Sequence, residues 1–305
     1  MSAEIIDGRA CAARLKQAVA LEAKDLRERG LPCALSTVMV GDDYSAAAYE
    51  RRLRRAADEL DIPYRRHALP RGAGQRQVTE AIADLNADPE VTGVLVLRPL
   101  PAGVREADVF RTLSPLKDIE AVNPENAGLL ALGTPRYVPS TAASAFHLLD
   151  SWLDDAGEDR TAFYRRSLIV VVGRSNNVGK PLVSLAYHRQ AAVESVDEWA
   201  SRSATGLGPH LRRADVVIVA AGQAGLITGE HVKEGAVVID VGINPVTDDA
   251  TGRLRMVGDA DFASVAARAR AVSPVPGGVG PVTDIWLMRN TVAAARLLSG
   301  AAAAC

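Results

Sequence analysis

A glycine turn after an apolar run carries the clearest sign of ligand chemistry in this chain. Residues 168–172 read Leu-Ile-Val-Val-Val, a pattern that predicts a buried strand, and a glycine-containing segment follows directly. Such a turn before a helix aims backbone N–H groups at an anion, with the helix dipole behind them. The residues expected to bind the anion are Gly173, Arg174, Ser175, Val178 and Gly179. An ordinary strand-to-helix turn is the alternative interpretation, because two glycines alone make a weak dinucleotide-binding signature.

An acidic residue follows the next predicted strand. Asp197 lies about twenty residues beyond the glycine turn, the offset at which an acid hydrogen-bonds the ribose hydroxyls of NAD. A carboxylate there disfavours NADP, because it would lie beside the additional phosphate. Arg174 is the opposing signal, since a guanidinium could hold that phosphate. The sequence therefore predicts a dinucleotide site with NAD preferred and NADP possible, against the alternative that Asp197 only caps a solvated helix.

The composition argues against several other classes of function. The 305 residues carry a formal net charge of -2, which disfavours a large basic surface for nucleic acid or an anionic membrane. The three cysteines and five histidines show no metal-ligand spacing and no disulfide framework, so we expect no metal site and a reducing compartment. We expect neither a signal peptide nor a membrane helix, because no apolar run approaches the roughly 20 residues that such a helix needs. These features predict a soluble, cytoplasmic protein.

Alternating strand and helix patterns must position the candidate residues. The expected strands cover 33–40, 64–69, 93–97, 168–172, 191–196, 215–220 and 236–241. The expected helices cover 8–30, about 43–60, 75–87, 142–153 and 281–299. This alternation predicts an α/β fold of two α/β domains, the second a Rossmann-like dinucleotide-binding domain with a parallel sheet, and a cleft between them.

Further short motifs occur in both halves of the chain. They are Pro99-Leu100-Pro101, Pro115-Leu116-Lys117-Asp118, Asn126-Ala127-Gly128, Ala221-Gly222-Gln223, Ile239-Asp240-Val241-Gly242-Ile243-Asn244, Val257-Gly258-Asp259 and Pro274-Val275-Pro276-Gly277-Gly278-Val279-Gly280-Pro281 with Thr283. In the last of these, prolines fix the backbone direction and glycines allow close approach to a ligand. Together with the glycine turn, the motifs and their order resemble the bifunctional methylenetetrahydrofolate dehydrogenase/cyclohydrolases over nearly the whole chain.

The resemblance implies a division of labour along the chain. Residues 1–150 would form the folate-binding catalytic domain, residues 151–282 the NAD(P)-binding domain, and a helix over 283–305 would pack back on the first domain. Further cofactor contacts would come from Ala221, Gly222, Gly242, Ile243, Gly280 and Thr283. Substrate contacts would come from Tyr49, Leu97, Pro99, Leu100, Glu120, Pro276, Gly277 and Gly278. The resemblance also implies a homodimer formed through the cofactor domain.

The chain departs from the family at its catalytic element. The family has a tyrosine followed four residues later by a lysine, a spacing that places both side chains on one helix face. Tyr49 is present, but the lysine position is Leu53, and Arg52 and Arg54 are expected to point about 100° to either side. The family's glutamine before its Leu-Pro-Leu-Pro motif is replaced by Leu97. The family's pterin-binding aspartate is replaced by Glu120, and the glycine that follows this aspartate is replaced by Ala121. Asp284 takes a position that is usually apolar, and is interpreted as a helix-start charge in preference to a cleft carboxylate.

These departures bear on the two activities of the family differently. Hydride transfer to nicotinamide mainly needs two bound rings in the correct orientation, whereas hydrolysis of the methenyl product needs a group that manages protons. The sequence therefore predicts an NAD-linked oxidation of 5,10-methylenetetrahydrofolate to 5,10-methenyltetrahydrofolate, in which Tyr49 and Glu120 act and cyclohydrolase activity is weak or absent. Two alternatives remain: a paralogue with a changed substrate, favoured by Leu97, Glu120 and Ala121, and a non-catalytic folate- or nucleotide-binding protein.

Overall fold

The computed structural model describes residues 3–203, 206–247 and 252–300, and its backbone divides into two compact units. The six-stranded unit comprises Met1–Ala13 and Thr141–Thr283, and the three-stranded unit comprises Arg14–Ser140 and Asp284–Cys305. Both are α/β units built on parallel sheets, so the predicted fold class is confirmed. The division differs from the predicted domain bounds, because β1 (Glu4–Ile5) pairs with β11 (Ala271–Val272) and thereby joins the start of the chain to the six-stranded sheet.

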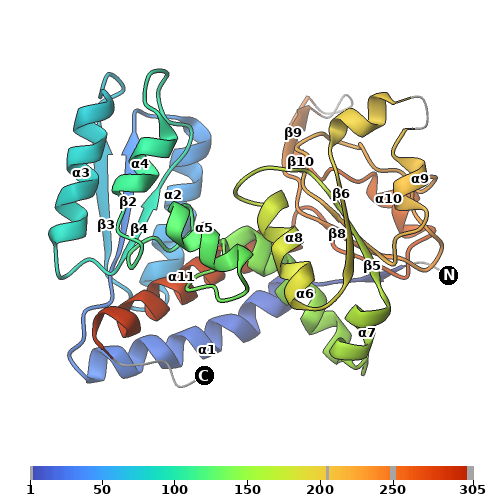
Figure 1. Ribbon diagram of the computed structural model, residues 1–305, viewed down its shortest axis with the longest axis horizontal. Helices are drawn as coiled ribbons and strands as arrows, with labels where there is room; N and C mark the ends of the chain where they lie inside the picture. The colour runs from blue at the N-terminus through green and yellow to red at the C-terminus, as the bar shows by residue number, and fades with distance from the viewer. Residues whose placement is uncertain (1–2, 204–205, 248–251, 301–305) are drawn as a thin grey trace. The chain divides into compact units, whose positions relative to one another are not determined.

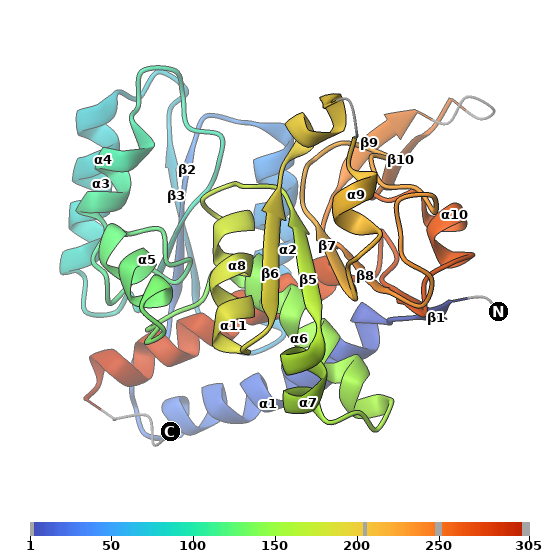
Figure 2. The same ribbon diagram turned by 45° about the vertical axis from the view of Figure 1, so that its right-hand side comes forward.

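The three-stranded unit is a sheet with helices on both faces. Strands β2 (Leu35–Val40), β3 (Tyr64–Leu69) and β4 (Gly93–Val96) are parallel, in the order β3-β2-β4. Figures 1 and 2 show α3 (Gln75–Ala87) and α4 (Glu106–Thr112) on one face and α2 (Tyr44–Asp58) on the other. Because alternate side chains of a strand face opposite ways, Val38 packs in the core against α3 and α4, whereas Thr37 donates a hydrogen bond to Glu50 on α2.

Two long helices complete this unit. Helix α1 (Gly8–Glu28) and helix α11 (Val279–Leu298) lie side by side in Figures 1 and 2. Arg296 on α11 forms an ion pair with Glu22 on α1 at 2.8 Å. The buried Asn290 Nδ2 donates to the carbonyl oxygens of Ile119 at 2.7 Å and Val138 at 2.9 Å. Asn290 therefore fixes α11 to the loops on either side of α5 (Pro124–Ala131).

The six-stranded unit is doubly wound. Its sheet has the order β1-β11-β8-β7-β5-β6, and every neighbouring pair is parallel. The central strands β5 (Leu168–Val172), β7 (Val216–Val219) and β8 (Val237–Asp240) are almost entirely buried, as their runs of β-branched residues predict. Helices α6 (Ser140–Asp155) and α8 (Gly179–His188) cover one face, and α9 (Gly208–Leu211) and α10 (Phe262–Ala266) cover the other (Figure 2).

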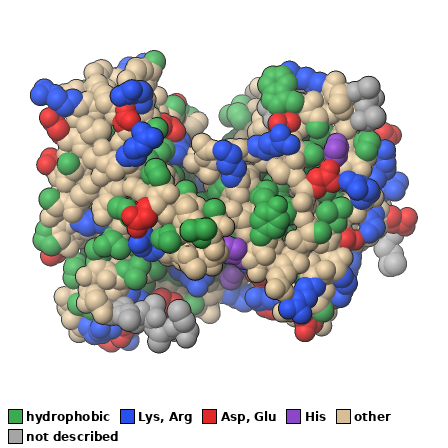
Figure 3. Space-filling view, in the orientation of Figure 1, with side chains coloured by type: hydrophobic (Ala, Val, Ile, Leu, Met, Phe, Trp, Pro, Cys, Tyr) green, Lys and Arg blue, Asp and Glu red, His purple; other side chains and the backbone are tan. Residues whose placement is uncertain are grey.

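The remaining elements are short. They are β6 (Ala192–Val196), the 3-10 helix η1 (Glu198–Arg202), α7 (Arg160–Arg166) and the antiparallel pair β9 (Asn244–Thr247) and β10 (Leu254–Val257). Within the described ranges, no helix is both long and apolar enough to span a membrane. On the face drawn in Figure 3, acidic and basic side chains are interspersed.

Asn290→Ala tests the attachment of α11. The substitution leaves the carbonyl oxygens of Ile119 and Val138 without this donor, so we expect the free energy of unfolding to fall by about 2 kcal/mol. Denaturant titration of the variant and the unchanged chain measures the difference. Glu90→Gln, at an exposed position of the same unit, is the control and should change the free energy of unfolding by no more than about 0.5 kcal/mol. Equal stability of the two variants would contradict the assignment.

Candidate active site

The strand order of the six-stranded unit marks one edge as a ligand site. From β5 the chain passes to β6 on one side and then to β7 on the other, so the winding reverses between β5 and β7. In open α/β sheets, ligands bind at the carboxyl ends of the strands at such a reversal. The predicted glycine turn at Gly173 follows β5, and the segment Ala220-Ala221-Gly222 follows β7. The structure therefore brings these two predicted segments together.

The glycines of the turn are required by close backbone contacts. Gly173 has φ 121°, and a Cβ atom built there would lie 2.2 Å from the carbonyl oxygen of Ala220. At Gly179, the first residue of α8, a Cβ atom would lie 2.1 Å from the carbonyl oxygen of Gly173. A residue with a Cβ atom would collide with the backbone at either position. The start of α8 therefore packs directly on the turn. This cradle fits the pyrophosphate of a dinucleotide.

Charged and polar side chains of the turn are already engaged with each other. Arg174 Nη1 lies 3.3 Å from Asp197 Oδ2, and Arg174 Nη2 donates to the carbonyl oxygen of Ser195 at 2.8 Å. Ser175 Oγ accepts hydrogen bonds from the N–H groups of Val178 at 3.2 Å and Gly179 at 3.3 Å. Arg174 and Asp197, the two opposing signals for cofactor choice, thus form one ion pair at the end of β6.

Two buried carboxylates, which we did not predict as site residues, hold the adjacent loops. Asp259 is fully buried and accepts hydrogen bonds from the N–H groups of Ala221 at 2.6 Å, Gly222 at 2.9 Å and Gln223 at 2.9 Å. It also accepts one from Asn244 Nδ2 at 2.8 Å. The N–H groups of the predicted cofactor residues Ala221 and Gly222 are therefore occupied by Asp259.

The second carboxylate, Asp240, lies at the end of β8. It accepts hydrogen bonds from the N–H groups of Gly242 at 2.9 Å, Asp259 at 3.0 Å and Ala260 at 2.9 Å. Burial raises its pKa to about 6, although these N–H donors act in the opposite direction. A Cβ atom at Gly258 would lie 1.9 Å from Asp240 Oδ2, so glycine is required there. The motifs Ile239-Asp240-Val241-Gly242 and Val257-Gly258-Asp259 were the signal for this network.

The Gly/Pro-rich loop lies at the start of α11. Gly8 N–H donates to the carbonyl oxygen of Gly277 at 2.9 Å, and a Cβ atom at Gly8 would lie 1.7 Å from the carbonyl oxygen of Gly278. The Val275–Pro276 peptide bond is cis. The remaining residues predicted near this loop and the β8 turn are placed as follows: Ile243 is exposed, Gly280 lies in the first turn of α11, and Thr283 Oγ1 donates within α11 to the carbonyl oxygen of Val279 at 3.1 Å.

In the three-stranded unit, α2 carries the predicted catalytic element. Asp43 caps the helix, since its carboxylate accepts the N–H of Ala46 at 2.9 Å. Tyr49 is half-buried, and Leu53, at the position of the family's lysine, is fully buried. The interval of four residues places Tyr49 and Leu53 one turn apart on one side of the helix, as predicted.

Arg52, which precedes the lysine position Leu53, contacts both Tyr49 and helix α11. Its guanidinium carbon lies 5.0 Å from the centre of the Tyr49 ring, because long helical side chains lean towards the preceding turn. Arg52 Nε also donates to Asp284 Oδ2 at 3.2 Å. Asp284 is the sixth residue of α11 and lies beyond its first turn. Its interpretation as a helix-start charge was therefore wrong.

Glu120 belongs to the same group of side chains, which we call the tyrosine cluster: Tyr49, Arg52, Glu120 and Asp284. Burial raises the pKa of Glu120 to about 7, and a hydrogen bond with Ser140 offsets part of this effect. The pKa of Tyr49 is raised well above its usual value by burial and then by the charges of Glu120 and Asp284, while Arg52 lowers it. The four side chains therefore share one electrostatic environment.

The other predicted substrate residues differ in exposure. Leu97 is buried, Leu100 is half-buried and packs against the core between the sheet and α3, and Pro99, which follows a cis peptide bond, is exposed. Lys117 Nζ donates to the carbonyl oxygens of Leu85 at 2.9 Å and Asp88 at 2.6 Å, so it fixes the loop that carries Glu120. These interactions position the loop from which the charge of Glu120 acts on Tyr49.

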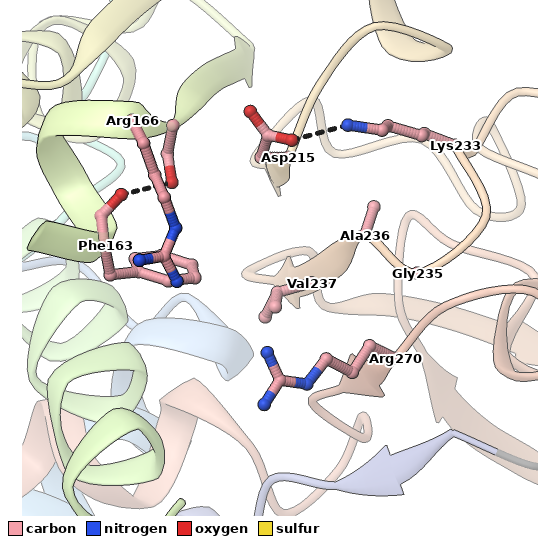
Figure 4. Close-up of a pocket in the computed structure, with 9 residues that line it drawn as sticks. Phe163, Arg166, Asp215, Lys233, Gly235, Ala236, Val237 and Arg270 are labelled. Carbon is pink, nitrogen blue, oxygen red and sulfur yellow. Dashed lines mark hydrogen bonds and ion pairs between the residues drawn. The ribbon is translucent and has the colours of Figure 1, made fainter. Parts of the chain in front are cut away.

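A separate cavity of about 250 Å³ lies at the opposite, amino end of the six-stranded sheet (Figure 4). Three cationic side chains line it, and each has a carboxylate partner: Lys233 pairs with Asp215 at 2.6 Å, and Arg166 and Arg270 both pair with Glu158 at 3.0 Å. None of the predicted site residues lies on this cavity, and its three cationic side chains are paired with two carboxylates.

Comparison with known proteins gives a consistent result. The tetrahydrofolate dehydrogenase/cyclohydrolase catalytic domain matches residues 6–120, and the NAD(P)-binding domain of the same family matches residues 139–298. "Bifunctional protein FolD 3" of Rubrobacter xylanophilus is 56% identical over 305 residues, which are all of this chain and 96% of that protein. "Bifunctional protein FolD" of Salinibacter ruber is 42% identical over 297 residues, 97% of this chain and 96% of that protein.

Solved structures extend the similarity to three dimensions. The bifunctional FolD enzyme of Campylobacter jejuni superposes with a TM-score of 0.87 at 30% identity, covering 97% of this chain and 99% of that one. The Trypanosoma brucei enzyme, solved with NADP and an inhibitor, gives a TM-score of 0.87 at 32% identity, covering 97% and 98%. The chain therefore belongs to the tetrahydrofolate dehydrogenase/cyclohydrolase family.

Proposed function

We propose that the protein oxidises 5,10-methylenetetrahydrofolate to 5,10-methenyltetrahydrofolate with NAD⁺, and that its cyclohydrolase activity is weak or absent. The observation that carries the proposal is the state of α2: Tyr49 is retained, while the lysine position is a fully buried leucine, Leu53. When bound, the nicotinamide ring would accept a hydride from the methylene carbon. That transfer depends mainly on how the two rings are held, and the glycine cradle and the tyrosine cluster are suited to hold them.

The cyclohydrolase step makes a different demand. Attack of water on the methenyl carbon requires a group that removes and returns protons. A guanidinium does not exchange its proton as an amine does, and that of Arg52 is paired with Asp284, so Arg52 cannot take over the role of the lysine. The raised pKa of Tyr49 keeps its phenol protonated. Both facts support a dehydrogenase that releases its methenyl product intact.

The choice of NAD rests on the ion pair between Arg174 and Asp197. Binding of NADP would place a 2′-phosphate beside the Asp197 carboxylate and would require Arg174 to leave its partner. Binding of NAD requires neither, because its ribose hydroxyls donate hydrogen bonds to a carboxylate. The same proposal includes a cytoplasmic homodimer, as the resemblance implies.

A changed substrate is the second candidate, and one backbone feature favours it. Ala121 has φ 51°, a left-handed conformation that suits the glycine found there in the family better than alanine. The strained residue lies directly beside Glu120, and the buried Leu97 replaces a polar residue. These features support a reshaped ring pocket.

One assay separates these functions. The purified chain is incubated with methylenetetrahydrofolate and NAD⁺ or NADP⁺, and the absorbance of reduced cofactor and of methenyltetrahydrofolate is followed together. We expect reduced NAD to appear in step with a methenyl species that decays no faster than without enzyme. Accelerated decay would overturn the claim about cyclohydrolase activity. No reduction of either cofactor would overturn the dehydrogenase proposal in favour of a changed substrate.

Asp197→Ser tests the cofactor preference. Removing the carboxylate abolishes the repulsion of a 2′-phosphate and frees Arg174 to bind it, so the ratio of kcat/KM for NADP to that for NAD should rise about tenfold or more. The control, Glu234→Gln, removes one negative charge from an exposed position of the same unit and should leave the ratio unchanged. A ratio that stays constant in Asp197→Ser would contradict the assigned role.

Glu120→Gln tests the carboxyl group of the tyrosine cluster through pH. The pKa of Glu120 is raised from 4.5 to about 7 in the folded state. Between these two pH values the folded chain therefore keeps a proton on Glu120 that the unfolded chain has lost. The contribution of this proton to the free energy of unfolding is therefore fully present below about pH 4.5 and is lost as the pH rises towards 7. We expect the variant to be less sensitive to pH than the unchanged chain between pH 5 and 7, with a smaller decrease in the free energy of unfolding.

The same variant has an expected effect on turnover. Loss of hydride leaves a cation on the substrate, and an ionised carboxylate nearby stabilises it. The rate of methenyl formation should therefore rise as the pH increases through about 7, and this rise should be absent in Glu120→Gln. If turnover and the free energy of unfolding depend on pH in the same way in Glu120→Gln and in the unchanged chain, Glu120 is not the titrating group.

A further inference from the structure

We propose that Asp284 is a second substrate-recognition carboxylate, which Arg52 holds beside Tyr49 so that Asp284 and Glu120 together accept hydrogen bonds from an aminopyrimidine ring. The identity of that ring rests on the proposed function, since tetrahydrofolate contains a 2-amino-4-oxopyrimidine. Asp284 would then be a specificity-determining residue that is not part of the family's tyrosine–lysine element.

Arg52 joins two helices of the three-stranded unit. Its guanidinium contacts two groups from different elements, the Tyr49 ring on α2 at 5.0 Å and Asp284 Oδ2 on α11 at 3.2 Å. One cation therefore fixes the orientation of the Asp284 carboxyl group relative to the tyrosine. Its positive charge also lowers the cost of placing the Asp284 carboxylate near Tyr49, on which the charge of Glu120 acts as well.

The carboxyl groups of Asp284 and Glu120 each keep one oxygen atom that is buried and has no hydrogen-bond partner among the described residues. Asp284 uses Oδ2 for Arg52, whereas its Oδ1 is buried and has no hydrogen-bond partner among the described residues. Glu120 Oε1 is buried and without a partner in the same sense. Buried acceptors in folded proteins are almost always paired, because an unpaired one costs about 1–3 kcal/mol. Two such oxygens, on residues whose charges both act on Tyr49, indicate a ligand that brings N–H donors.

The two partners of the ion pair differ in exposure. The side chain of Asp284 is 16% exposed, whereas that of Arg52 is 55% exposed. A salt bridge that only joined two helices at the surface would contribute little stability and would not require a buried second oxygen. The buried side of the pair is the carboxylate, which is the partner that can accept a hydrogen bond from a ring held against Tyr49.

The chemistry selects the class of ligand. An aminopyrimidine presents N–H donors on an amino group and on ring nitrogens, and a carboxylate is the acceptor that pairs best with such an edge. With two carboxyl groups near Tyr49, the unit can engage donors at two positions of the ring. Analogues that lack one donor would leave a buried oxygen unpaired and bind more weakly.

The test measures binding of two ligands to matched variants of the full chain. Tetrahydrofolate and its analogue without the 2-amino group are titrated by calorimetry into the unchanged protein, Asp284→Asn, Asp284→Glu and Arg52→Gln. Arg54→Gln is the control, since it removes a guanidinium from an exposed position on the same helix. Thermal midpoints of all variants are recorded in parallel.

We expect Asp284→Asn to weaken tetrahydrofolate binding about tenfold, with a smaller effect on the analogue. Asp284→Glu should restore part of the affinity, Arg52→Gln should resemble Asp284→Asn, and Arg54→Gln should have no effect. In the dehydrogenase assay, Asp284→Asn should raise KM for the folate and change kcat much less. The thermal midpoints should remain similar.

Two outcomes would overturn the proposal. One is unchanged tetrahydrofolate affinity in Asp284→Asn; the other is an equal loss for both ligands together with a lowered thermal midpoint, which would show a structural role alone. Failure of the proposed function has a different signature. In that case the unchanged protein reduces neither cofactor, while the dependence of tetrahydrofolate binding on Asp284 can still be measured.

Discussion

The buried carboxylates Asp240 and Asp259 are the interaction on which the cofactor edge of the six-stranded unit depends. They follow different strands, yet Asp240 accepts the N–H of Asp259, and Asp259 accepts the N–H groups of the segment after β7. Several backbone N–H donors point at each carboxyl group and offset the cost of burying it. The network fixes the loops at the carboxyl ends of the strands, and the glycine cradle is formed against one of them.

The network limits which backbone N–H groups could bind the phosphates of a dinucleotide. The N–H groups after β7 are committed to Asp259, so anion binding falls to the turn after β5 and the start of α8. That turn is held at van der Waals distance from its neighbours by Gly173 and Gly179, at which any larger residue would collide with backbone. The carboxylates thus determine the shape of the site, and the glycines determine how closely a ligand can approach it.

In the three-stranded unit, the charge arrangement differs from that of the tyrosine–lysine element. A buried leucine takes the place of the lysine, and a guanidinium from the preceding residue lies over the tyrosine and is bound to a carboxylate of α11. A fixed, paired cation can orient groups but cannot exchange protons at neutral pH. The regrouping is consistent with a site that favours binding and hydride transfer over hydrolysis.

Local patterns in the sequence were sufficient to predict most strands, the long helices and the glycine turn. Periodicity and glycine content reflect the conformation of a residue and its near neighbours, so they can be detected without knowing the fold. The spacing of Tyr49 and Leu53 on one helix side was predictable for the same reason.

The partners of charged groups depended on the tertiary structure. The contact between Arg52 and Asp284 joins positions 232 residues apart, and the hydrogen bonds of Asp259 to the turn after β7 span 36 to 38 residues. A helical wheel gives the direction in which a side chain leaves the backbone, but the position of the end of a long arginine depends on which partner the fold brings near. The sequence by itself therefore determined that Arg52, Asp284, Asp240 and Asp259 have ionisable side chains, and only the tertiary structure decided which of these side chains are buried and what they bind.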